Sequence, residues 1–160
     1  MITLHQFAPV WNIPNLSPFC VKVETYLRMV NLPYEVRNSL PAKGPKGKLP
    51  FIEDNGKTIA DSRLILEYLE NNYGHRLNGH LDDRQKAIST AAERLMEEYL
   101  LWLGLYTRWQ YSEQNRQITL KAIFASLPWF IRNSAAFFVR RQVLKKIPAQ
   151  GAGLLSAAEI

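Results

Sequence analysis

The sequence predicts an α/β domain followed by an all-helical domain, and three observations lead to this fold class. First, the segments up to residue 74 read in order as strand, helix, strand, loop, strand, strand and helix. Second, the composition changes after residues 75–80, and residues 81–147 have the periodicity of long helices. Third, the chain has 160 residues, 47% apolar and 21% charged, which suits a globular protein of one ordinary domain or two small ones. The expected domains are residues 1–75 and 81–160.

The first half of the α/β domain has clear boundaries. Residues 2–8 alternate with β-rich composition and predict the first strand. Ser17 and Pro18 predict a helix start, because serine is a common N-cap and proline a common first helical residue. This helix should run to about residue 29. Residues 34–37 are expected to form a second strand, and the Pro-, Gly- and Lys-rich residues 41–48 a surface loop.

The second half predicts a hairpin and another helix. Strands are expected at residues 49–53 and 57–60, joined by a tight turn at residues 54–56. Asp61 or Ser62 should open a helix that closes near Gly74, a residue type typical just past a helix end. The helical remainder should be interrupted near residues 112–115 and bent or broken at Pro128.

The last residues carry every signal for the start of one more helix. Ser156 and Glu159 form a capping box, and Leu155 and Ile160 occupy the two positions of a hydrophobic staple. We therefore expect the sequence to be a shortened form of a longer protein. Helices that lose their cover expose apolar surface, so we also expect rearrangement or pairing into a homodimer or higher oligomer.

Charge and composition bear on partners and location. The net charge of +6 is concentrated late, at Arg132, Arg140, Arg141, Lys145 and Lys146, with no acid among them. Such a stretch can attract nucleic acid or anionic lipid, but it is more often the solvated face of a helix, and no nucleic-acid motif accompanies it. The N-terminus does not have the pattern of a signal peptide, and the apolar run at 127–139 is shorter than the about 20 residues of a membrane span. We expect a cytoplasmic protein with neither a nucleic-acid partner nor a membrane span.

Cys20 is the only cysteine, and it falls in the first turn of a predicted helix. Free amides and the helix dipole stabilise a thiolate there, which predicts a lowered pKa and a reactive thiol. The alternative is a small buried hydrophobic residue. Because Ser17 stands three residues earlier, intramolecular dithiol chemistry is excluded, which leaves thiolate binding or a mixed disulfide with a small thiol.

Two further segments have the chemistry of a binding site. Pro50 heads a strand after a flexible loop, which suggests a cis peptide that would leave the Leu49 backbone open for pairing with a short peptide. Lys48 beside it could meet a carboxylate, or it is an ordinary solvated lysine. At the next helix start, Ser62 and free amides could hold a carboxylate and Asp61 an ammonium group, or one of the two merely caps the helix.

Two other groups of residues are weaker candidates. Tyr99, Trp102, Tyr106 and Trp109 share one helix face, which is typical of a core or dimer surface and otherwise of the wall of an apolar pocket. His75 and His80 have no recognisable metal-ligand spacing, so no metal site is expected.

Taken together, three motifs resemble the thioredoxin-like N-terminal domain (β-α-β-β-β-α) of glutathione transferases. They are S-P-F-C at 17–20, G-K-L-P-F-I at 47–52 and A-D-S-R-L-I-L-E-Y-L at 60–69. The form S-P-F-C-V-K-V-E-T-Y-L-R is most similar to the branch containing the failed-axon-connections and metaxin-like proteins. The resemblance implies an all-α C-terminal domain of the transferase type, here incomplete.

The resemblance also implies a glutathione site. Cys20 or Ser17 would face the glutathione sulfur, and Leu49, before a cis Pro50, would pair with its cysteinyl backbone. Asp61 and Ser62 would hold the γ-glutamyl end, and Lys48 the glycine carboxylate or a group nearby.

The implied activity is glutathione-dependent conjugation or thiol transfer to a small electrophile or mixed disulfide, with glutathione as co-substrate and no metal. The alternative is a non-catalytic interaction module of the metaxin type. Which of Ser17 and Cys20 would activate the thiol is open.

Overall fold

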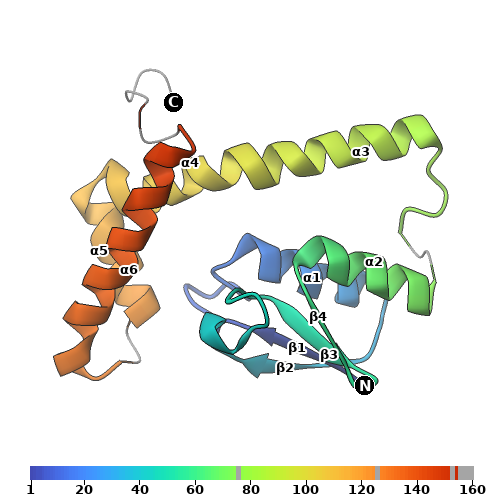
Figure 1. The fold of residues 1–160 in the computed structure, drawn as a ribbon, viewed down its shortest axis with the longest axis horizontal. Helices are drawn as coiled ribbons and strands as arrows, with labels where there is room; N and C mark the ends of the chain where they lie inside the picture. Colours follow the sequence, from blue (N-terminus) through green and yellow to red (C-terminus); the bar gives the residue numbers. More distant parts are fainter. Residues whose placement is uncertain (75–76, 125–126, 152–153, 155–160) are drawn as a thin grey trace. The chain divides into compact units, whose positions relative to one another are not determined.

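The protein consists of two compact units, residues 1–82 and 83–160, each with its own hydrophobic core (Figure 1). The computed structural model describes residues 1–74, 77–124, 127–151 and 154. The capping box at 156–159 and His75 lie outside the described residues.

The first unit has the element order that the sequence predicts. Its elements are β1 (Ile2–Gln6), α1 (Pro18–Met29), β2 (Tyr34–Asn38), a short 3₁₀ turn (Pro41–Lys43), β3 (Phe51–Asp54), β4 (Lys57–Ala60) and α2 (Ser62–Tyr73). The third strand begins at Phe51, not at residue 49, since Pro50 has no amide hydrogen to offer the ladder.

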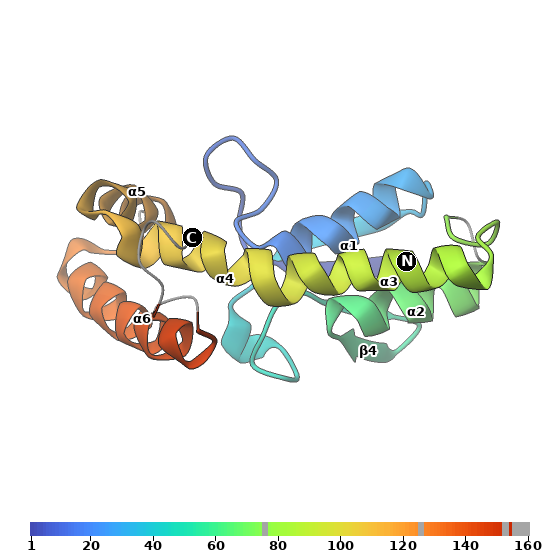
Figure 2. The same cartoon turned by 90° about the horizontal axis from the view of Figure 1, so that it is seen from above.

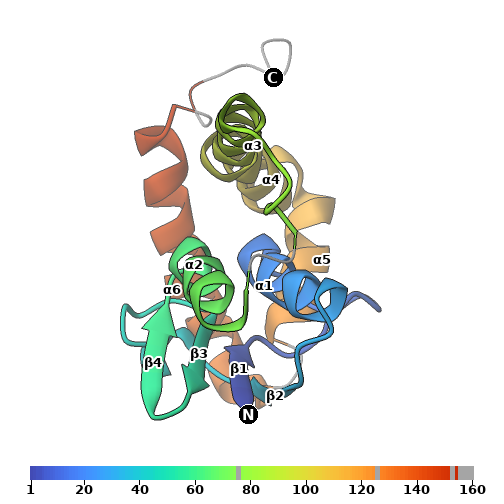
Figure 3. The same cartoon turned by 90° about the vertical axis from the view of Figure 1, so that its right-hand side faces the viewer.

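The four strands form one mixed sheet in the order β2-β1-β3-β4. β1 runs parallel to β2 and antiparallel to β3, and β3 and β4 form an antiparallel hairpin. Its turn residues Asn55 and Gly56 have φ of 48° and 73°, as a type I′ turn requires. Both α1 and α2 cover the same face of the sheet (Figure 3). This arrangement is the predicted thioredoxin-like fold.

The core of the first unit lies between the sheet and its two helices. Buried apolar side chains come from strands β1 and β3 and from both helices, and they include Ile2, Leu4, Val23, Leu27, Ile52, Ile65 and Leu69. These residues follow the strand and helix periodicities from which the elements were predicted.

The second unit begins with one continuous helical run (Figure 2). It comprises α3 (Asp83–Leu95), a π-helical segment (Met96–Leu100), α4 (Leu101–Tyr106) and a second π-helical segment (Thr107–Tyr111). The run ends at Ser112, whose backbone is extended, and α5 (Glu113–Phe124) and α6 (Trp129–Ala149) follow. Pro128 is the N-cap of α6, so the chain is broken at both predicted places.

The core of the second unit forms around Trp109, Phe124 and Ile147. Trp102 and Tyr106 pack against it, whereas Tyr99 is 51% exposed. The aromatic face predicted from the sequence therefore contributes mainly to this core. Along the described residues, no helix combines the length and the apolar character needed to cross a membrane.

Candidate functional site

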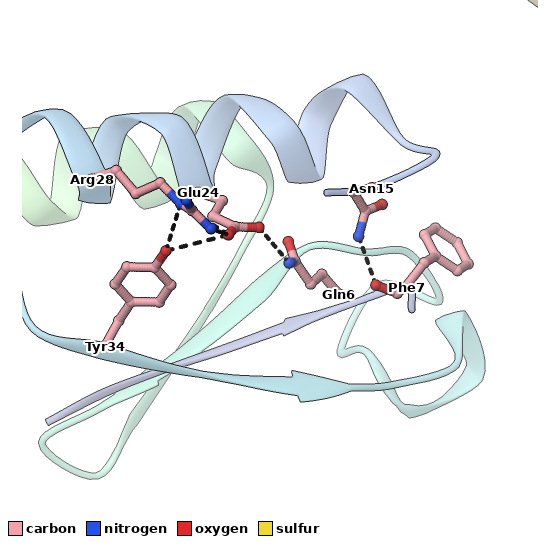
Figure 4. A network of polar contacts seen from close by, with 6 residues as sticks. All are labelled: Gln6, Phe7, Asn15, Glu24, Arg28 and Tyr34. Carbon is pink, nitrogen blue, oxygen red and sulfur yellow. Dashed lines mark hydrogen bonds and ion pairs between the residues drawn. The ribbon is translucent and has the colours of Figure 1, made fainter. Parts of the chain in front are cut away.

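A buried asparagine fixes the start of α1 against the end of β1. Asn15 is 1% exposed. Its Nδ2 donates to the Phe7 carbonyl at 2.7 Å (Figure 4), and its Oδ1 accepts from the Ser17 amide at 3.0 Å. Sequence reasoning missed this residue, although an asparagine two residues before a helix start is the signal of an Asx turn. Asn15 thus determines where Ser17 lies relative to the sheet.

Ser17 is the N-cap of α1, as predicted, but its side chain does not cap the helix. Its backbone is extended, with φ of −87° and ψ of 123°, and no side-chain cap hydrogen bond forms. The hydroxyl instead shares a hydrogen bond with the Cys20 sulfur. Ser17 is half-buried.

Cys20 lies inside the domain. Its exposed fraction is 0%, and it packs in a cluster with Leu49, Phe51 and Ala60, against which Phe7 also packs. These residues come from α1, the segment before β3, β3 itself and the end of β4. The sulfur is therefore enclosed where the three sequence motifs meet.

The predicted lowering of the Cys20 pKa is wrong. Burial raises the pKa of this thiol, and the nearby charge of Glu24 raises it further. Hydrogen bonds from the Ser17 hydroxyl and the Phe7 backbone act in the opposite direction but do not outweigh burial. The helix N-terminus does not lower the pKa below its ordinary value, because the sulfur is buried and the thiolate would lose its hydration. The catalytic assignment of Cys20 stays a prediction.

The peptide bond between Leu49 and Pro50 is cis, as the sequence suggested. The Leu49 side chain is 7% exposed and packs in the Cys20 cluster. Pairing of β3 with β1 begins one residue after Pro50, at the pair His5 and Phe51. In the described part of the chain, no hydrogen bond outside the regular elements uses the Leu49 amide or carbonyl. Its backbone is therefore available to a ligand in extended conformation.

The loop that carries Lys48 folds back on itself. Amides of Gly44 and Gly47 donate to the carbonyls of Pro41 and Gly44 at 2.9 Å each. A Cβ on Gly44 would lie 2.3 Å from the Lys48 carbonyl oxygen, so only glycine fits there. Lys48 itself is exposed. The structure describes no ion pair or hydrogen bond that joins its side chain to the other predicted site residues.

Asp61 caps α2, which decides between the two start residues that the sequence left open. Its Oδ1 accepts from the amides of Arg63 at 3.1 Å and Leu64 at 3.4 Å. Two of the amides expected to be free for a ligand are thus occupied. Ser62, the first helical residue, is 6% exposed, and the Asp61 cap does not use its amide or hydroxyl. Asp61 has φ of 89°, which is strained for a residue other than glycine.

The predicted site residues therefore gather at one end of the first unit. Cys20 and Leu49 pack together, and Ser17 is hydrogen-bonded to Cys20. Asp61 directly follows Ala60, a member of the same cluster. This end combines the Leu49 backbone, a hydroxyl and a capped helix start that carries a carboxylate.

A buried polar network beside this end was not predicted. Glu24 of α1 is 5% exposed. Gln6 donates to it at 2.6 Å, the Arg28 side chain pairs with it, and the Tyr34 hydroxyl donates to it at 3.3 Å (Figure 4). Burial raises the pKa of Glu24, but the hydrogen bonds from Gln6 and Arg28 outweigh it and the pKa is lowered. Glu24 is therefore held ionised one turn beyond Cys20.

A second unpredicted cluster joins the β3–β4 hairpin to α2. Asp54 is 2% exposed, and its Oδ2 accepts from the hydroxyls of Tyr68 at 3.0 Å and Tyr73 at 2.7 Å. The bond to Asp54 raises the pKa of Tyr73 to about 12. The hairpin and the C-terminal half of α2 are thereby fastened to each other.

His5 packs within the sheet and contacts residues of neighbouring segments. Its ring stacks on Phe51 with centroids 4.1 Å apart, and its Nδ1 lies 3.0 Å from the Ser39 hydroxyl. Its Nε2 lies 3.3 Å from the Glu53 carboxylate and makes no hydrogen bond within the described residues. Within the described ranges, no group of three or more His, Cys, Asp or Glu side chains could hold a metal ion.

Glutathione-transferase-like proteins have a thioredoxin-like domain followed by a helical unit. At one end of that first domain lie a helix start, a cis-proline segment and a second helix start, as in this chain. A family model described as the glutathione S-transferase N-terminal domain matches residues 18–115. The chain belongs to the glutathione S-transferase family.

The relatives include members of the failed-axon-connections and metaxin-like branch that the sequence resembles, and a glutathione transferase. Failed axon connections of Drosophila melanogaster is 38% identical over 100% of this chain and 40% of its own length. Isoprene-epoxide--glutathione S-transferase of Rhodococcus sp. (strain AD45) is 40% identical over 69% of this chain and 49% of its length. Metaxin-2 of Mus musculus is 30% identical over 82% of this chain and 50% of its length. The chain thus spans half or less of the length of these relatives.

The fold is found in solved structures as well. A glutathione transferase homolog from Burkholderia, with bound glutathione, has a TM-score of 0.54 and 21% identity, and covers 64% of this chain and 57% of its own. At that identity the likeness shows the shared fold.

Proposed function

We propose that this protein binds glutathione at the end of the first unit where α1, β3 and α2 begin, and that it transfers the bound thiol to a small electrophile or mixed disulfide. The observation that carries the proposal is the packing of Cys20, Leu49 and Ala60 in one cluster. This packing brings three separate sequence segments to one place. A glutathione transferase homolog with the same fold has been solved with bound glutathione.

Each part of glutathione has a chemically suitable group at this end. Glutathione is an extended tripeptide with one ammonium group, two carboxylates and a thiol. The Leu49 backbone can pair with its central residue as an added strand. The Asp61 carboxylate suits the ammonium group, and the Ser62 amide and hydroxyl suit the γ-glutamyl carboxylate. Lys48 suits the glycine carboxylate, and the Ser17 hydroxyl the sulfur.

Calorimetric titration with glutathione tests the binding step. We expect millimolar or tighter affinity, and we expect Ser62→Ala to weaken it about 10- to 150-fold, because a hydrogen bond to a charged group contributes roughly 1.5–3 kcal/mol. Ser89→Ala is the matched control, since Ser89 lies on α3 in the second unit. Absence of binding at millimolar glutathione would contradict the proposal.

The second candidate function is a non-catalytic interaction module. It is favoured by the burial of Cys20 and by the likeness to Failed axon connections and Metaxin-2, whose names state no transferase activity. Turnover separates the two functions. Conjugation of glutathione to chlorodinitrobenzene, or reduction of hydroxyethyl disulfide, supports the enzyme, whereas binding without either reaction supports the module.

We also propose a homodimer and a cytoplasmic location. Exposed apolar side chains on the helices of the second unit, such as Phe130, Phe137 and Phe138 of α6, favour self-association. Light scattering coupled to gel filtration measures the oligomeric state, and fractionation of cells producing the protein measures its location.

A further inference from the structure

The α6 helix carries apolar side chains on two sides. On one side, Val143 and Ile147 pack in the core of the second unit, where α6 contacts α4, α5 and the second π-helical segment (Figure 2). Away from this core, Phe130, Phe137 and Phe138 are 65%, 59% and 64% exposed. A helix that packs on a core by one side normally turns polar side chains to the solvent. These aromatic side chains therefore mark a surface that binds a partner.

Every charged side chain of α6 is positive. They are Arg132, Arg140, Arg141, Lys145 and Lys146. Arg140 is used inside the unit, where its charge acts on Glu113 of α5. Arg141, Lys145 and Lys146 are exposed, and none of the ion pairs in the described part of the chain includes them. The positive charge of this helix is therefore available to an anionic partner.

The exposed aromatic and basic side chains share one side of α6. Phe138, Arg141 and Lys145 follow one another at spacings of three and four residues, which makes them neighbours on the helix surface. Phe137 stands four residues before Arg141 and belongs to the same side. We call this side the outer face of α6. An apolar surface bordered by cations is complementary to an anionic bilayer, whose acyl chains accept the rings and whose phosphates attract the cations.

Two other occupants fit the outer face less well. A second copy would bring the same positive charges to it, and the homodimer proposed above can form through exposed apolar residues of the preceding helical run, such as Leu95 and Met96. Nucleic acid would be attracted by the charges, but Ile131 and Val139, which are 43% and 37% exposed, are aliphatic and offer no ring for a base to stack on. Both aliphatic and aromatic side chains enter the headgroup region of a bilayer.

We propose that α6 is a peripheral membrane-binding helix, which lies in the plane of an anionic bilayer surface. The rings of Phe130, Phe137 and Phe138 enter the headgroup region, and Arg141 and Lys145 lie at the lipid phosphates. This mode of binding requires no helix that crosses the bilayer. It goes beyond the proposed glutathione chemistry and does not depend on it, because all of these residues belong to the second unit.

Co-sedimentation of the full chain with lipid vesicles tests the charge requirement. Vesicles of phosphatidylcholine with about 30% phosphatidylserine should bind at least about tenfold more tightly than vesicles of phosphatidylcholine alone, and about 0.5 M NaCl should weaken this binding. The double variant Arg141→Gln/Lys145→Gln should bind about 25-fold more weakly, since each basic side chain near an anionic surface contributes about fivefold. Arg84→Gln/Lys121→Gln removes the same charge from α3 and α5, and it should change the affinity less than about threefold.

A second pair of variants tests the insertion of the rings. Phe137→Ser/Phe138→Ser should bind at least about tenfold more weakly than wild type. Ile88→Ser/Ile118→Ser, at residues 60% and 48% exposed on α3 and α5, should bind as wild type does, and circular dichroism checks that all variants keep their helices.

Four results would overturn the proposal. The first is equal binding of wild type to both kinds of vesicle, and the second is wild-type affinity in Phe137→Ser/Phe138→Ser. The third is binding to single-stranded RNA without binding to vesicles, which would assign the outer face to nucleic acid. The fourth is a dimer that dissociates in Phe137→Ser/Phe138→Ser while wild type binds no vesicles, which would assign the face to a second copy.

Discussion

Asp61 combines a helix cap with a backbone conformation that few residues adopt, so substitutions there separate two physical effects. Replacement by alanine removes the side-chain acceptor of the Arg63 and Leu64 amides. The loss of such a cap costs about 1 kcal/mol. Alanine must also adopt φ of 89°, which costs about 1–2 kcal/mol more. We expect Asp61→Ala to lower the free energy of unfolding by about 2–3 kcal/mol.

Glycine at the same position removes the side-chain cap but adopts the positive φ without strain. Replacing a cap with glycine costs only a few tenths of a kcal/mol, and glycine adopts positive φ freely. The free energy of unfolding of Asp61→Gly should therefore lie within about 0.5 kcal/mol of that of the wild type. Asp61→Asn keeps both the acceptor and the tolerance of positive φ, so its stability should match wild type while its glutathione affinity falls with the lost charge.

Urea unfolding of the whole chain, followed by circular dichroism, measures these differences. The dependence of the unfolding free energy on urea should be the same for all variants, which makes the midpoints comparable. If Asp61→Ala were as stable as Asp61→Gly, the backbone at residue 61 would not be strained and the reasoning would fail. If Asp61→Asn were as unstable as Asp61→Ala, the cap assignment would fail.

Three further predictions concern groups elsewhere in the chain. Because the pKa of Glu24 is lowered in the fold, its stabilising effect is complete above its unfolded value of about 4.3 and is lost as the pH falls through the folded value. Glu24→Gln should reduce the dependence of the unfolding free energy on pH in this range and lower the stability at neutral pH. An unchanged pH dependence would show that the Glu24 network does not stabilise the fold. The pKa of Tyr73 is raised to about 12, so its stabilising effect is complete below about 10 and is lost between 10 and 12. Spectrophotometric titration should show a tyrosine that ionises near 12, and Tyr73→Phe should remove it. Gly104 lies inside α4 with nothing within 4 Å of an added Cβ, and Gly104→Ala should raise the unfolding free energy by about 0.5–1 kcal/mol, whereas destabilisation would indicate a contact there.

Local signals in the sequence predicted the fold well. Ser17 with Pro18 specifies where α1 begins, and Asn55 with Gly56 specifies the hairpin turn, because each acts through the conformation of its own few residues. The break at Pro128 is of the same kind. These signals do not depend on what the rest of the chain does.

The candidate site was predicted less completely, because its chemistry depends on contacts between distant segments. The pairs Gln6 with Glu24 and Asp54 with Tyr73 are 18 and 19 residues apart, and neither follows from a local pattern. The direction of the Cys20 pKa shift has the same origin. The helix start is visible in the sequence, whereas the enclosure of the sulfur requires the folded domain.

The bond of Asp54 to Tyr68 and Tyr73 also affects how the first unit opens. It makes the β3–β4 hairpin and α2 one cooperative unit, since the hairpin cannot leave α2 without exposing a buried carboxylate. Leu49 precedes this unit, and Asp61 and Ser62 lie within it. The groups proposed to hold the γ-glutamyl end of the peptide are therefore gained or lost together with the hairpin that follows Leu49. A ligand that spans them would slow hydrogen exchange across the whole hairpin and helix together, and not only at the amides it touches.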